Sequence, residues 1–165
     1  MVNSTNSQKV LDLRAKYSPL TDEDILKSAQ AILAERLNRA DLLLSSPKVV
    51  ADYLISQLAT LEHEVFAALF LDNRHRLLTY QELFRGTING CSAHSRELVK
   101  FALHCNSAAV ILAHNHPSGV ADPSEADKTL TKRLTDALAL VDVWVLDHSV
   151  IGAGEAVSFS ERGLL

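Results

Sequence analysis

The chain has 165 residues, of which 47% are hydrophobic, which suffices for one domain with a substantial core but not for two comfortable ones. No apolar stretch approaches the roughly 20 residues that a membrane-spanning helix requires, and residues 1–16 lack the apolar centre of a signal peptide. We therefore expect a cytoplasmic protein with no membrane partner. The formal net charge of −4 does not support a nucleic-acid partner.

The amino-terminal quarter divides into two segments. Residues 1–20 are polar and aperiodic and are expected to form a flexible arm. Residues 21–45 are predicted to be largely helical, because Thr21 and Asp24 resemble a helix cap and apolar residues follow at helical spacing. The main domain is expected over residues 46–165.

The main domain is predicted to alternate between helices and strands. Ser46 is placed to cap a helix that runs to about residue 61, with Pro47 at its first position. The remaining elements follow in chain order: a buried strand at 65–71, a turn and a second hairpin strand at 76–84, a helix at 95–104, a strand at 108–113, a helix at 124–140, a strand at 143–146 that 149–151 extends or pairs with, and a short strand at 156–159. This order predicts an α/β fold, with a mixed sheet flanked by helices.

The two cysteines, Cys91 and Cys105, do not make a disulfide framework, and their spacing fits no thiolate metal site. We expect both to be reduced and buried or half-buried.

The residues that follow the strand at 108–113 carry the strongest chemical signal. His114 and His116 are two residues apart, so they point to one side if the chain stays extended there. Asp127 lies in the first turn of the next helix, and the turn at 117–119 can fold that helix back toward the imidazoles. Two imidazoles and one carboxylate are typical of catalytic zinc with water in the fourth position. The spacing therefore predicts one zinc ion per chain.

Each part of this pattern also has a simpler explanation. Two of seven histidines can fall two residues apart by chance. Ser124 and Asp127 have the spacing of a helix cap, which by itself is the more common role and is compatible with a catalytic one.

A zinc hydrolase also requires a carboxylate that accepts a proton from water and passes it to the leaving group. Glu64 is favoured by its position at the head of the first strand, provided that this strand pairs with the one ending at His114. Spacing alone does not establish this role, and without further information an ordinary polar residue that ends the preceding helix is the first interpretation of Glu64. The candidates are Glu62, Glu64, Glu97, Glu125 and Asp147.

Two further pairs of polar residues have a functional and an ordinary interpretation. Asp147 or His148 can orient a ligand histidine, or both are surface residues after a strand. Arg85 and Arg96 can line a substrate cleft, or they are solvated charges.

Several blocks together closely resemble the RadC family of the JAMM/MPN metalloprotease superfamily. They are EVF at 64–66, ELFRGT at 82–87, AHNHPSG at 113–119 with Ser124 and Asp127, and LDH at 146–148. The resemblance extends from about residue 46 to 163, and the short amino-terminal part resembles the abbreviated, prophage-type bacterial members. It implies a single domain of the JAMM/MPN type, which is cytidine-deaminase-like.

The resemblance also implies roles for five residues. His114, His116 and Asp127 correspond to the metal ligands, Glu64 to the general acid/base, and Ser124 to the serine that stabilises the oxyanion. The implied activity is that of a zinc-dependent metallopeptidase or isopeptidase, whose substrate is a peptide or protein of unknown identity.

Two other functions stay open at this point. One is a DNA-repair-associated or nucleic-acid-linked accessory protein, although an amino-terminal part of about 60 residues leaves little room for the helix-hairpin-helix segment of longer members. The other is a non-catalytic metal-binding module. The sequence is compatible with a dimer but has no diagnostic patch for one.

Overall fold

A computed structural model describes residues 21–38, 46–86 and 94–165, except for the side chains of 34–38. The predicted arm at 1–20, the second part of the segment 21–45, and Cys91 lie outside the described residues. Cys105 is half-buried and free, as expected for a reduced cysteine. No helix of the described part of the chain is both long and apolar enough to cross a membrane.

A mixed five-strand sheet forms the centre of the domain, in the order β2-β1-β3-β4-β5. The pairs are antiparallel except for β3 and β4, which are parallel. The predicted strand at 143–146 and its extension form one strand, β4. The strands are β1 (Val65–Leu71), β2 (Leu77–Arg85), β3 (Ala109–Asn115), β4 (Trp144–Ile151) and β5 (Ala156–Ser158). The prediction of a mixed sheet flanked by helices is confirmed.

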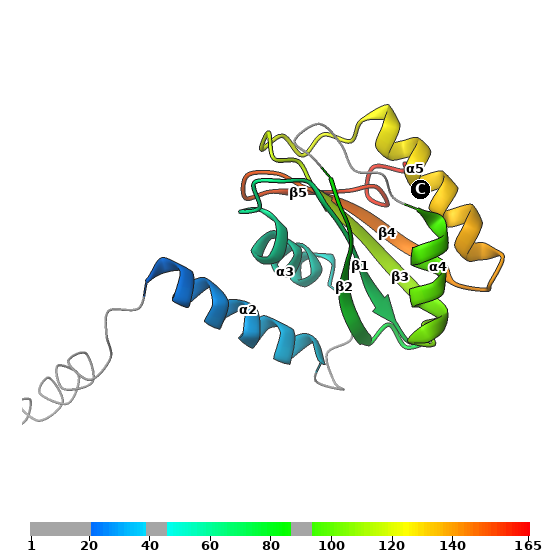
Figure 1. The fold of residues 1–165 in the computed structure, drawn as a ribbon, viewed down its shortest axis with the longest axis horizontal. Coiled ribbons are helices and arrows are strands. Elements are labelled where there is room, and N and C mark those ends of the chain that lie inside the picture. Colours follow the sequence, from blue (N-terminus) through cyan, green and yellow to red (C-terminus); the bar gives the residue numbers. More distant parts are fainter. Residues whose placement is uncertain (1–20, 39–45, 87–93) are drawn as a thin grey trace, which may run out of the picture.

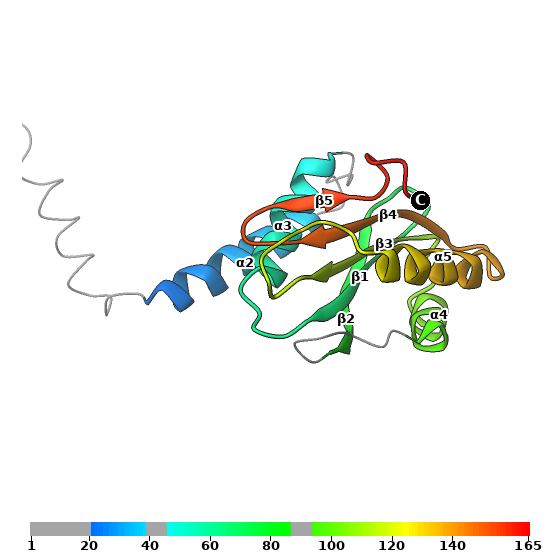
Figure 2. The ribbon, with the colours of Figure 1, turned by 90° about the horizontal axis from the view of Figure 1, so that it is seen from above.

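Helices cover both faces of the sheet (Figures 1 and 2). Helix α3 (Pro47–Leu58) packs on one face, and α4 (Ser95–His104) and α5 (Glu125–Ala139) pack on the other. Helix α2 (Asp22–Asn38) contacts α3, where Gln30 Nε2 donates to the carbonyl oxygen of Ser56 at 2.6 Å. The result is a helix–sheet–helix arrangement.

The continuous apolar run of β1 is explained by its central position, since all seven of its residues are buried. Val65, Ala67 and Leu69 face the α3 side, whereas Phe66 and Ala68 face α4 and α5. A strand covered on both faces needs apolar residues at every position, not only at alternate ones.

Two predicted helix starts differ in their capping. Thr21 and Asp24 exchange the reciprocal bonds of a cap: the Asp24 amide donates to Thr21 Oγ1 at 3.2 Å, and the Thr21 amide donates to Asp24 Oδ2 at 3.0 Å. Ser46 occupies the cap position of α3, with Pro47 next to it, but its side chain makes no capping hydrogen bond. The predicted cap position is therefore confirmed without a capping bond, and Pro47 favours the helix start, because its ring fixes the backbone in a helical φ.

The topology brings the end of β3 and the starts of β1 and α5 to one edge of the sheet. The carboxyl end of β3 lies beside the start of β1, because these strands are antiparallel and Phe66 pairs with His114. Helix α5 starts at the same edge after the connection at 116–124 and returns the chain to β4, the parallel neighbour of β3. The first turn of α5 therefore lies next to the residues that end β3.

Candidate metal centre

His114, His116 and Asp127 converge at this edge of the sheet. The Nε2 atoms of the two histidines are 3.0 Å apart, His114 Nε2 lies 3.3 Å from Asp127 Oδ1, and His116 Nε2 lies 3.5 Å from Asp127 Oδ2. One ligand atom from each residue can be chosen so that all lie within 4.8 Å of one another. His114 on β3, His116 directly after it and Asp127 on α5 thus form one cluster, as the spacing predicted.

The cluster has the dimensions of a shared metal site. Ligand atoms about 2.0–2.2 Å from a tetrahedrally coordinated zinc ion lie roughly 3.3–3.6 Å apart. The spacings of 3.0, 3.3 and 3.5 Å are close to this range. The donor set of two imidazoles and a carboxylate therefore fits a metal ion such as zinc in both type and spacing.

His114 is held in the interior of the domain. It is 1% exposed and stacks on Phe66, its pairing partner on β1, with ring centroids 6.2 Å apart. Its Nδ1 atom lies 2.8 Å from Nε2 of His148 on β4. The ring therefore presents only its Nε2 edge to the cluster.

His116 is fixed by backbone contacts in the loop after β3. Its amide donates to the carbonyl oxygen of Ile151 at 2.9 Å, and its Nδ1 donates to the carbonyl oxygen of Val120 at 2.7 Å. Because a carbonyl oxygen can only accept, Nδ1 carries a proton, and Nε2 is the ring nitrogen that faces the cluster.

Asp127 is both a member of the cluster and the third residue of α5. The Ser124 amide donates to Asp127 Oδ2 at 2.7 Å, and the Asp127 amide donates to Ser124 Oγ at 3.2 Å, which completes a capping box. Burial raises the pKa of Asp127, but the hydrogen bond and charge of His114 and the hydrogen bonds of Ser124 together hold this pKa well below its usual value. The carboxylate is therefore ionised and oriented toward the imidazoles.

Ser124 is a helix cap in this structure. Its hydroxyl donates to Asp127 Oδ2 at 2.6 Å and accepts from the Asp127 amide. The capping interpretation is confirmed, and the hydroxyl lies beside the cluster. Its role toward an oxyanion stays a prediction, which requires the proton to turn from Asp127 to a substrate oxygen.

Glu64 lies immediately before β1, at the edge of the sheet that carries the cluster. Burial raises the pKa of its carboxyl, and the charges of His114, Asp127 and His116 also act on this pKa. The carboxyl is thus half-buried and within electrostatic reach of the three cluster residues. The strand pairing on which its selection depended, β1 beside β3, is observed.

Asn115 anchors the segment that contains Glu64. Its Oδ1 accepts from the Val65 amide at 2.7 Å, and its Nδ2 donates to the carbonyl oxygens of His63 at 3.1 Å and Leu61 at 3.3 Å. The side chain is therefore bonded to the residues on both sides of Glu64. Asn115 was not predicted from the sequence to have a role.

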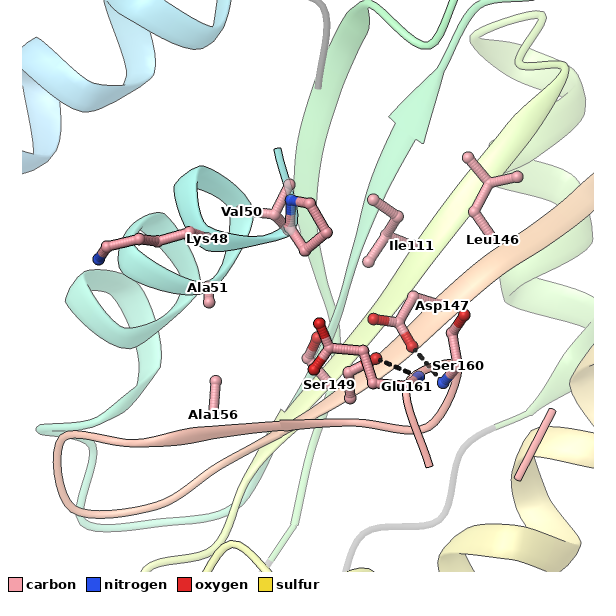
Figure 3. Close-up of a pocket in the computed structure, with 12 residues that line it drawn as sticks. Lys48, Val50, Ala51, Ile111, Leu146, Asp147, Ser149, Ala156, Ser160 and Glu161 are labelled. Atoms are coloured by element: carbon pink, nitrogen blue, oxygen red, sulfur yellow. Dashed lines mark hydrogen bonds between the residues drawn. The ribbon is translucent and has the colours of Figure 1, made fainter. Parts of the chain in front are cut away.

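The other acids considered as general base have different surroundings. Glu97 and Glu125 form exposed ion pairs with lysines on their own helices, and Glu62 is exposed. Asp147 lines an open pocket of about 340 Å³ on the α3 side of the sheet, where its Oδ1 accepts from the Ser160 amide at 2.9 Å (Figure 3). Neighbouring strand residues point to opposite faces, so Asp147 faces away from His148 and from the cluster.

His148 and Thr131 are polar residues behind the cluster; His148 was considered from the sequence, and Thr131 was not. His148 is fully buried between Phe66 and Phe159, and Thr131 Oγ1 lies 2.6 Å from its Nδ1. Burial and the charge of His114 lower the pKa of His148. Thr131 follows Asp127 by four residues on α5, and this helical spacing is the signal that could have placed both on one face.

The two arginines considered for a substrate cleft lie at the surface. Arg85 is exposed and pairs with Glu82 at 2.8 Å, and Arg96 is exposed on α4. These positions agree with solvated charges.

The loop that carries His116 is packed tightly against the β4–β5 connection, which provides a test of its positioning. A Cβ atom at Gly152 would lie 2.5 Å from the carbonyl oxygen of Gly119 and 3.0 Å from the Ala121 nitrogen. We expect Gly152→Ala to displace the loop, to lower the free energy of unfolding by about 1–3 kcal/mol and to weaken zinc binding. Chemical denaturation and a zinc titration measure both effects.

Gly154 provides the matched control. Its φ is +83°, but a Cβ atom there meets nothing within 4 Å. Gly154→Ala is expected to cost about 1–2 kcal/mol for the left-handed backbone and to leave zinc affinity unchanged. Wild-type zinc affinity in Gly152→Ala would show that this contact does not position His116.

Together, the mixed sheet between two helix layers and the cluster at the carboxyl end of β3 define a single α/β domain with a candidate metal site. The sequence model of the RadC-like JAB domain matches residues 44–164. The chain belongs to this family.

Curated relatives support the same assignment. The chain is 55% identical over 151 residues to a UPF0758 protein of Nitrosococcus oceani, a match that covers 92% of this chain and 66% of that relative. A UPF0758 protein of Methylibium petroleiphilum is 60% identical over 141 residues, covering 86% and 63%, and one of Vibrio parahaemolyticus is 55% identical over 150 residues, covering 91% and 66%. The chain thus spans about two thirds of the length of these relatives.

Proposed function

We propose that this domain is a zinc-dependent hydrolase of peptide or isopeptide bonds. The observation that carries the proposal is the convergence of His114, His116 and Asp127 at one edge of the sheet, with Glu64 at the same edge. Each part has a structural explanation on its own. Together they supply a three-ligand metal site and a carboxyl group that can move a proton.

The three ligands fit zinc in donor type and in spacing, as described above. When bound there, zinc would lower the pKa of water to about 7 and polarise a carbonyl oxygen.

The remaining chemistry falls to side chains of the chain. The Glu64 carboxylate accepts the proton of the attacking water and returns it to the nitrogen of the departing amine. Burial raises the pKa of Glu64, and a raised pKa makes the protonated form easier to reach, as the second step requires. Asn115 keeps this residue in place through its bonds to the Glu64-flanking backbone.

Ser124 is placed to act on the carbonyl oxygen of the substrate. Its hydroxyl is held 2.6 Å from Asp127 Oδ2, so a small rotation directs the proton toward a neighbouring oxyanion. Loss of one such donor typically costs about 3–4 kcal/mol of transition-state stabilisation.

Removal of the metal tests the proposal. We expect one zinc ion per chain by elemental analysis, and hydrolysis of members of a library of peptides and isopeptides. A chelator should abolish hydrolysis, and one equivalent of zinc should restore it. The circular dichroism spectrum should persist without metal, because both core clusters consist of apolar side chains and include none of the three ligands.

Three outcomes would contradict this function. Unfolding upon chelation would assign the metal a structural role, and a zinc-loaded protein that cleaves no library member would point to a binding module. DNA binding that weakens steeply with salt, without hydrolysis, would favour the nucleic-acid-linked alternative.

A further inference from the structure

A line of hydrogen bonds runs behind His114, on the side away from the other ligands. His114 Nδ1 lies 2.8 Å from His148 Nε2, and His148 Nδ1 lies 2.6 Å from Thr131 Oγ1. Thr131 Oγ1 lies 2.6 Å from the carbonyl oxygen of Asp127. The line therefore connects the ligand on β3 with the ligand on α5, by way of β4.

The directions of these hydrogen bonds follow from the available protons. A carbonyl oxygen can only accept, so the single hydroxyl proton of Thr131 is donated to Asp127. Thr131 Oγ1 can then only accept from His148, which places a proton on Nδ1 of that ring. This hydroxyl therefore favours the tautomer of His148 that is protonated at Nδ1.

The consequence passes on to His114. The His148 ring is fully buried and lies between the rings of Phe66 and Phe159, so its neutral form is favoured and its Nε2 carries a lone pair. That lone pair accepts the Nδ1 proton of His114. With a proton fixed on Nδ1, Nε2 is the atom of His114 that contacts Asp127 in the metal-free protein and is left to bind a metal.

We infer that Thr131 and His148 are positioning residues that select the tautomer in which His114 Nε2 binds metal. This rests on the proposed metal site, although it does not require hydrolysis. His116 needs no comparable device, since its Nδ1 proton is fixed by a backbone carbonyl. This role also accounts for the buried hydroxyl of Thr131, which lies one turn after Asp127 on α5.

Removal of the Thr131 hydroxyl tests the inference. In Thr131→Val the side chain keeps its shape, but Nδ1 of His148 loses its only acceptor. The proton of His148 can then move to Nε2, where it would clash with the Nδ1 proton of His114. We expect zinc affinity, measured by competition with a chelating dye, to fall by about 10–100-fold. Thr131→Ser keeps the hydroxyl and should retain wild-type affinity.

Thr135 offers a matched control one turn further along α5. Its hydroxyl is buried and has no hydrogen-bond partner. Thr135→Val therefore removes the same atom from the same helix without touching the line of hydrogen bonds, and its zinc affinity should equal that of the wild type.

A second measurement reads the tautomer directly. In the wild-type protein labelled with ¹⁵N-histidine, NMR should show His148 protonated at Nδ1 and unprotonated at Nε2. A proton on His148 Nε2 would overturn the inference even if Thr131→Val failed to fold. Equal zinc affinities of Thr131→Val and Thr135→Val, with both variants folded, would also overturn it. A protein that binds zinc and shows the expected tautomer without cleaving any peptide would contradict the proposed hydrolase only.

Discussion

Glu64→Gln should reduce kcat for hydrolysis by about 10²–10⁴-fold without loss of zinc. Glutamine has nearly the same shape but cannot accept and return a proton, and Glu64 lies at the cluster edge without belonging to the three-ligand group. The loss corresponds to about 3–5 kcal/mol of transition-state stabilisation. Steady-state kinetics on a cleaved library peptide, with zinc content measured on the same sample, provide the two readouts.

Glu62→Gln serves as the control for this variant. Glu62 is an exposed glutamate two residues upstream, and its substitution changes the net charge by the same amount. Its turnover should match that of the wild type. Unchanged turnover in Glu64→Gln would exclude Glu64 as the base. Loss of zinc from Glu64→Gln would instead identify Glu64 as a metal ligand.

Asp127→Asn should affect both metal binding and stability. The change removes a charged ligand. Mutation of residues that only contact a ligand lowers metal affinity by up to roughly 100-fold, and the loss in Asp127→Asn should be larger. It also weakens the capping box with Ser124, for which a loss of about 0.5–2 kcal/mol in unfolding free energy is expected. Asp136→Asn, on the exposed face of α5 beside Lys132, should change neither quantity appreciably.

The pH dependence of stability separates the cap from the metal. Burial raises the pKa of Asp127 in the metal-free folded protein. The hydrogen bond and charge of His114 and the hydrogen bonds of Ser124 outweigh this effect and hold the pKa well below its usual value. Its ionised form therefore stabilises the fold above the unfolded pKa of about 3.9, and this contribution is lost as the pH falls below that value. Urea denaturation of metal-free wild type and Asp127→Asn should show a difference at pH 7 that shrinks toward pH 3. A difference that stays constant would mean that the carboxylate charge does not stabilise the fold.

Local patterns in the sequence were sufficient to predict most elements of the sheet and the helices. The apolar run of β1 and the spacing of apolar residues in α5 each reflect burial along a single element, so they can be recognised from the residues of that element alone. The sheet order β2-β1-β3-β4-β5 depends on contacts between distant segments, and no local pattern specifies it. Ser46 shows a further limit, because a residue suited to capping can occupy the cap position without making the bond.

The candidate site was predictable where its residues are close in sequence. His114, His116 and Asp127 lie at the end of β3, directly after Asn115 and in the first turn of the next helix, respectively, so their short spacing was enough to predict the cluster. His148 comes from β4, and its contact with His114 requires the parallel pairing of β3 with β4. Asp147 and His148 were considered together, yet strand alternation sends them to opposite faces, and only His148 reaches the cluster.

Asn115 makes strand register a condition of catalysis in the proposed hydrolase. On β3, His114 projects toward the metal cluster while Asn115, its neighbour, bonds the backbone on both sides of Glu64. A single residue inserted into β3 would exchange the faces of these two side chains. One such insertion would then remove a metal ligand and release the general base together. We therefore expect insertions and deletions that preserve function to lie outside β1 and β3, even where the sheet itself would tolerate them within these strands.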